Sequence, residues 1–387
     1  MLEQKLSIVL LARSLEVGGA ERQLVELAKG LDQAGHQVQV AVFYKRGPLC
    51  EELDHSGIAI FDLGKAKRWD LVNFLARTAM TLKRLRPDIV YSFLGGANIV
   101  AAALQPFLPA THLVWSIRAS NMDLGHYDWT HRLGYRIERA MSGIPDLIVA
   151  NSSAGRDFAR DKGFPAARIR VIRNGIDIDR FKPDAGVRSV QRQLWGLSEN
   201  TQAIGILARL DPMKGHSIFI RAAALVAREG EDLRFLCIGD GPGLASLETL
   251  ASELGLGSRI KFTGQTNDPA AALNGLDLAC SASSFGEGFS NSIAEAMACG
   301  TSCVVTDVGD SAVIVGDLGS LVPPDDAEAL AGAMLRELEA RSPARSAAAR
   351  RRIVDHFSAR SMTEETLALF QGIAGGARLR KAARSLS

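Results

Sequence analysis

The fold is decided by residues 7–43, which read SIVLLARSLEVGGAERQLVELAKGLDQAGHQVQVAVF. The apolar run Ser7–Ala12 predicts a buried strand, and residues 38–43 predict the next strand. Between them one helical face is apolar, and Gly35 ends the helix. That face comprises Ala20, Leu24, Leu27, Ala28 and Leu31. Strand, glycine turn, helix and strand in this order are typical of a parallel sheet covered by helices.

The same alternation runs along the chain in two series. The first series predicts further strands at residues 88–93, 112–117, 146–150 and 169–172. The second predicts strands at residues 203–208, 233–238, 259–262, 277–280 and 302–306. Residues 183–186, Pro-Asp-Ala-Gly, lie between the series and predict a linker. We therefore expect an α/β protein of two facing, doubly wound Rossmann-like domains. Ligands of such sheets bind at the carboxyl ends of the strands, here in an interdomain cleft.

Composition excludes several classes of protein. The 387 residues suit two domains, and 47% hydrophobic with 23% charged residues is ordinary globular usage. The net charge of +2 argues against a nucleic-acid partner bound through bulk charge. Five cysteines without a C-x-x-C pair predict neither disulfides nor a zinc cluster, and favour a reducing, cytoplasmic setting. The first apolar run is too short for a signal peptide, and no run is long enough to span a membrane.

The most informative window is residues 285–300, FGEGFSNSIAEAMACG. Two glycines flank Glu287, so the backbone there can approach a ligand closely. Ser290 or Asn291 is expected to cap a helix that runs to Gly300, and the helix N-terminus would offer an anion site. Inside this apolar helix Glu295 stands alone as a charged residue, and burial of a carboxylate requires hydrogen-bond partners. A pair of ligand hydroxyls fits, and so does a structural role with a backbone amide or an arginine.

Other candidate elements follow predicted strands. Arg209 and Lys214 would converge at the end of one strand, where two cations suit a diphosphate, although a solvated surface pair is the alternative. Gly18 and Gly19 form a turn that brings amides close to a phosphate or sugar. Residues 239–243, GDGPG, suit a base or ribose, or form a plain tight turn.

Several familiar motifs are missing or poorly placed. The window after the first strand is not G-x-G-x-x-G, and the chain has no G-x-x-x-x-G-K-[ST]. Asp177 and Asp179 match D-x-D, but they lie at the predicted domain junction, so we expect no metal there. The chain has no H-E-x-x-H and no G-x-S-x-G, which argues against hydrolase and zinc chemistry.

Together these pieces resemble the retaining glycosyltransferase family 4, which has the GT-B fold. The resemblance rests on GGAER at 18–22, NSS at 151–153, VIRNGID at 171–177, Arg209 followed by KG at 214–215, IGDGP at 238–242, FTG at 262–264, and Glu287 paired with Glu295. It covers most of the chain in the family's order. The implied domains are residues 1–178 on the acceptor side, residues 179–357 for the nucleotide sugar, and residues 358–387 as a helix returning to the first domain with a basic tail.

The resemblance also implies roles for single residues. Glu295 would bind ribose hydroxyls, Glu287 would bind the transferred sugar, and Arg209 with Lys214 would neutralise the diphosphate. The remaining donor-binding residues would be Gly288, Phe289, Ser290, Asn291, Gly18, Gly19, Gly239, Gly241 and Gly264. Negative charge grows on the leaving diphosphate, and stabilising it is the main electrostatic task. Cations and a helix N-terminus supply this, so neither a metal nor another cofactor is expected.

The sequence departs from the family in one place. Family members commonly carry a His after the strand at 112–117, and here Arg118 stands in or near that place. We therefore assign no catalytic His, and expect Arg118 to contact phosphate of the acceptor or donor. An ion pair with Asp123 or Asp128 is the alternative.

The expected function is transfer of a sugar from a nucleotide-diphosphate sugar to a glycan or lipid-linked acceptor. A UDP-linked hexose or N-acetylhexosamine is the donor that the resemblance implies. Two alternatives stay open: a GT-B sugar-nucleotide epimerase or phosphorylase, and a non-catalytic sugar-nucleotide-binding protein.

A basic cluster predicts peripheral attachment to an anionic membrane through the first domain. It comprises Lys65, Lys67, Arg68, Arg77, Lys83, Arg84 and Arg86, with Trp69 among them. A solvated basic face is the alternative. The apolar face of the same helix, which includes Leu71, is expected in the core.

Overall fold

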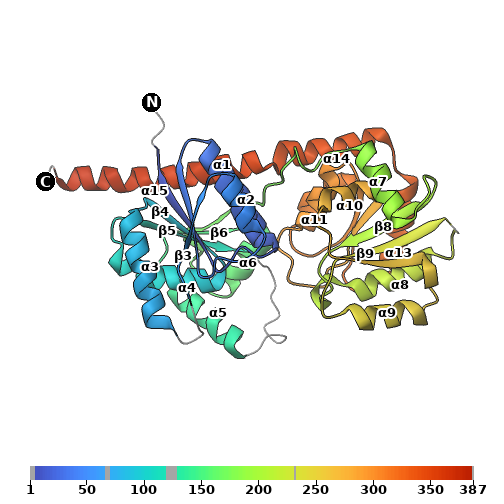
Figure 1. Cartoon of the computed structure of the whole chain (residues 1–387), viewed down its shortest axis with the longest axis horizontal. Coiled ribbons are helices and arrows are strands. Elements are labelled where there is room, and N and C mark those ends of the chain that lie inside the picture. Colours follow the sequence, from blue (N-terminus) through green and yellow to red (C-terminus); the bar gives the residue numbers. More distant parts are fainter. Residues whose placement is uncertain (1–4, 66–69, 119–128, 231, 386–387) are drawn as a thin grey trace. The chain divides into compact units, whose positions relative to one another are not determined.

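The computed structural model describes residues 5–65, 70–118, 129–230 and 232–385, and the side chains of residues 376–385 are not described. Contacts within the chain divide it into two units. Unit 1 comprises the described residues up to 175 together with the helix that begins at residue 359, and unit 2 comprises residues 176–358. In Figure 1 each unit is a sheet with helices on both faces. Two doubly wound parallel sheets were expected, and this fold class is confirmed.

Unit 1 contains a parallel sheet whose seven described strands have the order β3-β2-β1-β4-β5-β6-β7. The strands are β1 (Ser7–Ala12), β2 (Gln37–Val42), β3 (Ala59–Asp62), β4 (Ile89–Phe93), β5 (His112–Ile117), β6 (Leu147–Ala150) and β7 (Ile169–Val171). The helices are α1 (Gly19–Gln33), α2 (Leu49–His55), α3 (Leu71–Leu85), α4 (Leu94–Leu104), α5 (Trp129–Met141), α6 (Ser153–Asp161) and α15 (Ala359–Ser385), with short 3-10 turns η1 (Gln105–Phe107) and η3 (Ala166–Arg168). The predicted cap of α6 is confirmed, because Ser152 Oγ accepts from the Gly155 amide at 2.9 Å.

Helix α15 belongs to unit 1 although unit 2 separates it from the rest of that unit (Figure 1). It packs along α1, and its residues Met362, Phe370 and Ala374 are buried in the same core as the β1 side chains. The Phe370 ring lies 5.7 Å from the Tyr91 ring of β4, edge to face. No described helix combines the length and apolar content needed to cross a bilayer.

Unit 2 contains a parallel sheet whose six described strands have the order β10-β9-β8-β11-β12-β13. The strands are β8 (Gln202–Leu207), β9 (Leu233–Ile238), β10 (Ile260–Gly264), β11 (Leu278–Ser281), β12 (Ser302–Thr306) and β13 (Ser320–Val322). The helices are α7 (Ala185–Trp195), α8 (His216–Val226), α9 (Leu244–Glu253), α10 (Pro269–Gly275), α11 (Asn291–Ala298), α12 (Ser311–Val315), α13 (Ala327–Glu339) and α14 (Pro343–His356). Three 3-10 turns, η4 (Pro212–Lys214), η5 (Gly257–Arg259) and η6 (Gly316–Leu318), join them.

Three sequence-based expectations differ from the structure. The predicted linker at 183–186 is wrong, because Asp184 caps α7 by accepting from the Val187 amide at 2.9 Å. The edge strands β3 and β13 were not predicted, and both are short and mostly not buried, so their apolar signal is weak. Leu71 was expected in the core but is 48% exposed, because it lies in the first turn of α3.

The winding of each sheet reverses once. In unit 1 the reversal falls between β1 and β4, and in unit 2 between β8 and β11, which are hydrogen-bonded neighbours. Loops after two such strands run to opposite faces of the sheet and leave an opening at the carboxyl edge, where ligands of these folds bind. The strand order therefore locates one candidate site in each unit.

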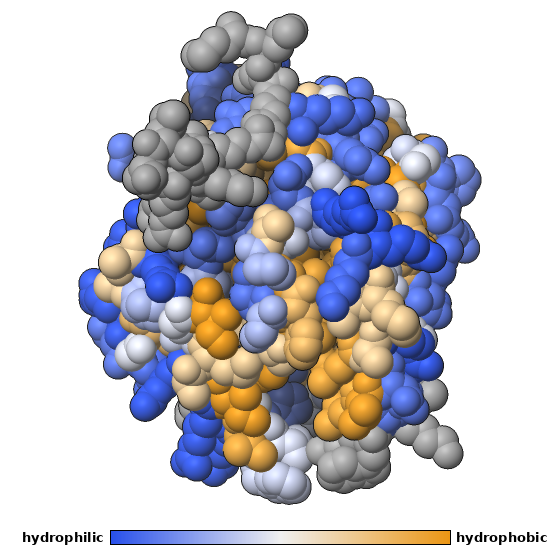
Figure 2. Space-filling model, turned by 90° about the vertical axis from the view of Figure 1, so that its left-hand side faces the viewer, coloured by the Kyte–Doolittle hydropathy of each residue, from blue (hydrophilic) through white to orange (hydrophobic). Residues whose placement is uncertain are grey.

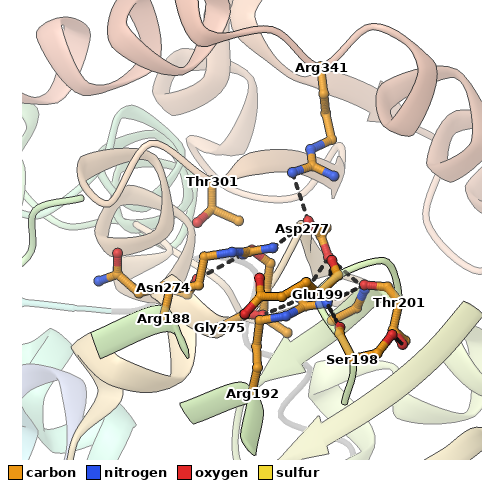
Figure 3. A network of polar contacts seen from close by, with 12 residues as sticks. Arg188, Arg192, Ser198, Glu199, Thr201, Asn274, Gly275, Asp277, Thr301 and Arg341 are labelled. Atoms are coloured by element: carbon orange, nitrogen blue, oxygen red, sulfur yellow. Dashed lines mark hydrogen bonds and ion pairs between the residues drawn. The ribbon is translucent and has the colours of Figure 1, made fainter. Parts of the chain in front are cut away.

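The opposite, amino edge of the unit 2 sheet is held by one buried carboxylate, Asp277 (Figure 3). Its oxygens accept from Arg188 at 2.8 Å, Arg192 at 3.0 Å and Arg341 at 2.7 Å. It also accepts from the Ala203 amide at 2.8 Å, which joins the starts of β11 and β8. Burial raises the pKa of Asp277, but the amide and the three guanidinium groups outweigh burial and hold this pKa below its usual value.

We predict that Asp277→Asn lowers the free energy of unfolding by about 3–5 kcal/mol, because the buried guanidinium of Arg192, the half-buried one of Arg188 and the exposed one of Arg341 lose their anion. The wild-type stabilisation is present above about pH 4 and is lost as the pH falls through the lowered pKa of Asp277. Chemical unfolding of both chains across this pH range measures it. Asp232→Asn, at an exposed position near the same edge, is the control and should change stability by less than about 0.5 kcal/mol. Equal stability of the Asp277 variant and wild type would contradict the assignment.

Candidate functional site

A small pocket with polar and apolar walls lies at the switch point of the unit 2 sheet. Its walls are the carboxyl ends of β8 and β11 and the loops that follow them. The lining residues are Ile206, Leu207, Ala208, Lys214, Cys280, Ser281, Ser283, Glu287, Ser290 and Ser292. Three of the predicted site residues, Lys214, Glu287 and Ser290, are thus brought together by the fold.

The pocket is organised around an ion pair between Lys214 and Glu287. The Lys214 Nζ lies 2.5 Å from Glu287 Oε2, and the Ser283 hydroxyl donates to the same oxygen at 3.2 Å. Glu287 is buried, and a buried carboxylate needs hydrogen-bond donors such as these. The pair joins the loop after β8 to the loop after β11. Both residues were predicted from sequence for neighbouring parts of one donor, and the structure places them in direct contact.

Lys214 is positioned by its own short turn. Asp211 caps η4 by accepting from the Met213 amide at 3.1 Å, and its carbonyl accepts from the Lys214 amide at 2.9 Å. Gly215 then turns with φ +65°, and a Cβ there would come 1.8 Å from the Ala282 carbonyl oxygen. Only glycine permits this approach, which seats the Lys214 turn against the end of β11.

His216 follows directly as the first residue of α8. Its ring is buried, and neither ring nitrogen has a hydrogen-bond partner among the described residues. Burial, and then the neighbouring charge of Lys214, lower its pKa to about 4. The imidazole is therefore neutral at pH 7 and adds no charge to the cation beside it.

Glu295 lies inside α11, where it is buried among apolar neighbours as the sequence indicated. The helix begins at Asn291, with Ser290 at the cap position, and it ends at Ala298 rather than at Gly300. The Ser290 side chain makes no capping hydrogen bond within the helix. The loop before α11 is anchored to the rest of the unit, because the Gly288 carbonyl accepts from the Asp310 amide at 2.8 Å.

Arg209 lies two residues beyond β8 and is 68% exposed along its side chain. Its guanidinium lies 2.7 Å from Asp211, the residue that caps η4. Both predicted diphosphate-binding cations are therefore held by carboxylates near the end of β8. An incoming diphosphate would have to compete with Asp211 and Glu287 for them.

The predicted glycines Gly239, just after β9, and Gly264, the last residue of β10, contact one another. The Gly239 amide donates to the Gly264 carbonyl at 2.9 Å, so the two loops are joined. A Cβ at Gly239 would lie 2.0 Å from the Ala208 carbonyl oxygen, and one at Gly241 would lie 2.6 Å from that of Leu210. Close packing against the chain's own backbone already accounts for these glycines. A donor-binding role for them stays a prediction.

In unit 1, Arg118 lies at the carboxyl edge of the sheet, one residue beyond β5. Its Nε donates to Ser116 Oγ and its Nη1 to Asn174 Oδ1, both at 2.6 Å. The guanidinium carbon lies 4.8 Å from the centre of the Phe93 ring at the end of β4. Burial lowers the pKa of Arg118, while Tyr91 and Glu21 act in the opposite direction. Arg118 is thus half-buried, and Ser116, Asn174 and Phe93 hold its guanidinium in place. The alternative partners Asp123 and Asp128 lie outside the described residues.

Gly18 and Gly19 begin α1 at the switch point of the same sheet. A Cβ on Gly18 would lie 2.2 Å from a carboxylate oxygen of Glu21, so that carboxylate folds back over the helix start. Burial raises the pKa of Glu21, and Arg118 is among the groups that lower it. Gly18, which was predicted to face phosphate, therefore lies beside an acid of this chain, while Gly19 is exposed.

Sequence reasoning missed three residues that shape these sites. Ser283 holds Glu287, Asn174 holds Arg118, and Glu21 covers Gly18. Asn174 and Glu21 lie within motifs that the sequence analysis already named. Ser283 lies two residues beyond β11, and this position at the carboxyl end of a strand is what could have identified it from sequence. Gln23 and Gly175 exchange two hydrogen bonds, at 2.8 and 2.9 Å, which fix the loop that carries Asn174.

Two further expectations concern metal and membrane. Asp177 accepts from the backbone amides of Asp179 and Arg180, so it shapes a turn. Within the described part of the chain no group of three His, Cys, Asp or Glu could hold a metal ion. Of the predicted basic cluster, Lys67, Arg68 and Trp69 lie outside the described residues, and Arg77 is paired with Asp70 at 2.9 Å.

The chain has two parallel-sheet units, and the strand order of each reverses once, at a switch point. Two doubly wound units of this kind are typical of the GT-B class of fold. Residues 17–180 match the family model described as Glycosyltransferase Family 4, and residues 201–340 match that described as Glycosyl transferases group 1. The chain belongs to the family 4 glycosyltransferases with the GT-B fold.

Similar proteins include a D-inositol 3-phosphate glycosyltransferase from Rhodococcus opacus (strain B4), 32% identical over 228 residues, which are 56% of this chain and 51% of that one. One from Mycobacterium bovis (strain BCG / Pasteur 1173P2) is 35% identical over 185 residues, which are 46% of this chain and 37% of that one. The chain thus spans about half the length of the curated relatives it matches, or less. The crystal structure of Anabaena HepE in complex with UDP has a TM-score of 0.82 at 25% identity, over 95% of this chain and 100% of that one.

We predict that Glu287→Gln and Glu295→Gln separate two kinds of contact. Glu295→Gln should weaken UDP binding by about tenfold or more, since it would remove the carboxylate that is predicted to accept from ribose hydroxyls. Glu287→Gln should lower turnover and leave UDP affinity unchanged or tighter, because Lys214 loses its competing carboxylate. Calorimetry with UDP and a transfer assay on the same preparations measure both. Equal losses of UDP affinity in the two variants would contradict these roles.

Proposed function

We propose that the protein is a retaining glycosyltransferase that transfers a hexose or N-acetylhexosamine from a UDP-sugar to a glycan or lipid-linked acceptor in polysaccharide or glycoconjugate biosynthesis. The observation that carries this proposal is the ion pair between buried Glu287 and half-buried Lys214 in the switch-point pocket of unit 2. Family membership supports the reaction class, and the HepE complex with UDP supports the nucleotide.

The proposed chemistry divides between the charged groups of the pocket. Glu287 binds hydroxyls of the sugar, and Glu295 binds those of the ribose. Lys214, Arg209 and the N-terminus of α11 stabilise the charge that develops on the diphosphate. Gly288, Phe289, Ser290 and Asn291 complete the donor site by their backbone. These groups of the chain supply the electrophilic assistance, so the proposal requires no metal ion.

The acceptor is proposed to bind unit 1. Arg118 lies at its sheet edge with its guanidinium plane fixed by Ser116, Asn174 and Phe93. A planar guanidinium suits the phosphate of a lipid-linked acceptor. We further propose a cytoplasmic protein that attaches peripherally to the inner face of an anionic membrane. The five cysteines are free and buried, which suits a reducing compartment.

Product analysis tests the reaction class. Incubation with UDP-sugars and a lipid-linked oligosaccharide, followed by anomer-resolved NMR, should show a product with the donor's anomeric configuration. Activity should persist in EDTA. Inverted product, free epimerised nucleotide sugar or phosphorolysis would each contradict the proposal. A thermal-shift screen of nucleotide sugars identifies the donor, because a ligand that binds only the folded chain raises its melting temperature.

We predict that Arg118→Lys lowers the transfer rate by about two orders of magnitude, because an ammonium cannot reproduce the fork that contacts phosphate while bonding Ser116 and Asn174. UDP affinity should stay nearly unchanged, since the predicted contacts to the ribose and most of those to the diphosphate lie in unit 2 and the proposed role of Arg118 is to bind the acceptor. Arg84→Lys, on the exposed side of α3, is the matched control and should be silent. A wild-type transfer rate in Arg118→Lys would refute the acceptor role.

A further inference from the structure

We infer that unit 2 carries a second ligand site, a cavity that binds an acidic sugar, either free or as one residue of a glycan. The cavity has a volume of about 360 Å³ and lies between the starts of α7 and α10. In Figure 1 these two helices lie side by side above the unit 2 sheet. Small-molecule sites have volumes of about 300–1,000 Å³. The site goes beyond the proposed reaction, because in the described part of the chain it shares no lining residue with the switch-point pocket.

Four charged side chains line the cavity, namely Arg180, Lys182, Asp184 and Asp268. Two of them are cations and two are carboxylates, yet neither cation forms an ion pair with any described residue. The opposite charges therefore remain apart around one space. A ligand in that space can contact groups of both signs at once.

Exposed charge alone does not mark a site on this protein. Figure 2 shows hydrophilic side chains over much of the face that it presents. Elsewhere in unit 2, carboxylates near cations have formed ion pairs, as Asp211 has with Arg209 and Glu287 with Lys214. The cavity differs because its opposite charges line the same space without pairing. Their hydrogen-bonding capacity is thus left for a ligand.

The two carboxylates each use one oxygen for the fold. Asp184 Oδ1 caps α7 by accepting from the Val187 amide at 2.9 Å, and Asp268 Oδ1 caps α10 by accepting from the Ala271 amide at 3.0 Å. The Oδ2 atom of each accepts no hydrogen bond from the residues that the structure describes. Because capping fixes each carboxylate, its second oxygen is held in place as an acceptor for a hydroxyl group.

The segment that carries the two cations has a fixed backbone. The Arg350 guanidinium donates to the Phe181 carbonyl at 2.8 Å. Asn274, which is buried in the cavity wall and labelled in Figure 3, donates to the Lys182 carbonyl at 3.0 Å and accepts from the Asp184 amide at 2.9 Å. A backbone held in this way lowers the cost of ordering the site when a ligand binds.

The mixture of charges decides the class of ligand. The two carboxylates would repel a diphosphate, and Arg180 and Lys182 would repel a cation. A neutral sugar would leave both of these cations without an anion. A sugar acid satisfies all four groups, because its carboxylate accepts from Arg180 and Lys182 and its hydroxyls donate to the carboxylates. An acidic sugar is therefore the ligand that the cavity fits.

The test is calorimetry of the full chain with four probes. These are glucuronate, glucose with its hydroxyls alone, inorganic phosphate as a plain anion, and β-alanine as a zwitterion without hydroxyls. Wild type should bind glucuronate at least about tenfold more tightly than the other three. Arg180→Gln/Lys182→Gln should weaken glucuronate binding by about tenfold or more. Arg221→Gln/Arg228→Gln removes two exposed cations elsewhere in unit 2, and this matched control should stay within about twofold of wild type.

A second variant tests the hydroxyl contacts. Asn caps a helix about as well as Asp, so Asp184→Asn/Asp268→Asn should keep the melting temperature close to that of wild type. Its glucuronate affinity should nevertheless fall by about fivefold or more, since two charged acceptors are lost. Unchanged glucuronate affinity in this variant would overturn the assignment to a sugar.

Three further outcomes would overturn the site. These are phosphate or β-alanine binding as tightly as glucuronate, unchanged glucuronate affinity in the Arg180 and Lys182 variant, and an equal loss in the control. Saturating UDP should leave glucuronate binding unchanged, and competition between the two would place glucuronate in the donor pocket instead. UDP binding and transfer are measured without glucuronate. A chain that binds UDP but no glucuronate therefore refutes the second site and leaves the proposed reaction standing.

Discussion

One carboxylate, Asp277, sets the geometry on which unit 2 depends. It joins the first residues of β11 to those of β8 and gathers three guanidinium groups from α7 and from the segment before α14. These two strands are the pair between which the winding of the sheet reverses. Fixing them at the amino edge leaves their carboxyl ends to diverge into loops. The candidate pocket lies at those carboxyl ends. The relative position of its two walls therefore depends on the Asp277 contact at the amino edge of the sheet.

Asp277 fixes the strands that carry the pocket, and an ion pair inside the pocket fixes its side chains in a similar way. Lys214 and Glu287 form an ion pair, and Ser283 adds a donor to the same carboxylate oxygen. Side chains held in this way lose little further conformational freedom when a ligand arrives. The His216 ring next to Lys214 is neutral at pH 7 and adds no further positive charge. A preorganised site of this kind favours a ligand that carries both anionic oxygens and hydroxyls.

Much of the fold and of the candidate site could be predicted from the sequence. The predictions that were wrong, and the residues that were missed, have physical causes. Central strands such as Ser7–Ala12 are buried on both faces and give continuous apolar runs, so they were predicted. The edge strands β3 and β13 are short and half-exposed, which leaves no such run. The residues at 183–186, Pro-Asp-Ala-Gly, are common both in linkers and at the start of a helix. Only the hydrogen bond from the Val187 amide to Asp184 shows that a helix begins here. Ser283 and Glu21 act through contacts that only the folded loops create.

The return of α15 to unit 1 has a consequence for how the chain is made. The first core needs Met362, Phe370 and Ala374, and these follow the whole of unit 2 in the sequence. Domains usually fold as they leave the ribosome, the N-terminal one first. Until α15 is made, the earlier half leaves the apolar side chains that α15 contacts uncovered, while the later half already has every residue of its own cores. Synthesis order and folding order are therefore opposed, and the nascent first unit is the stage at which a chaperone would find exposed apolar surface.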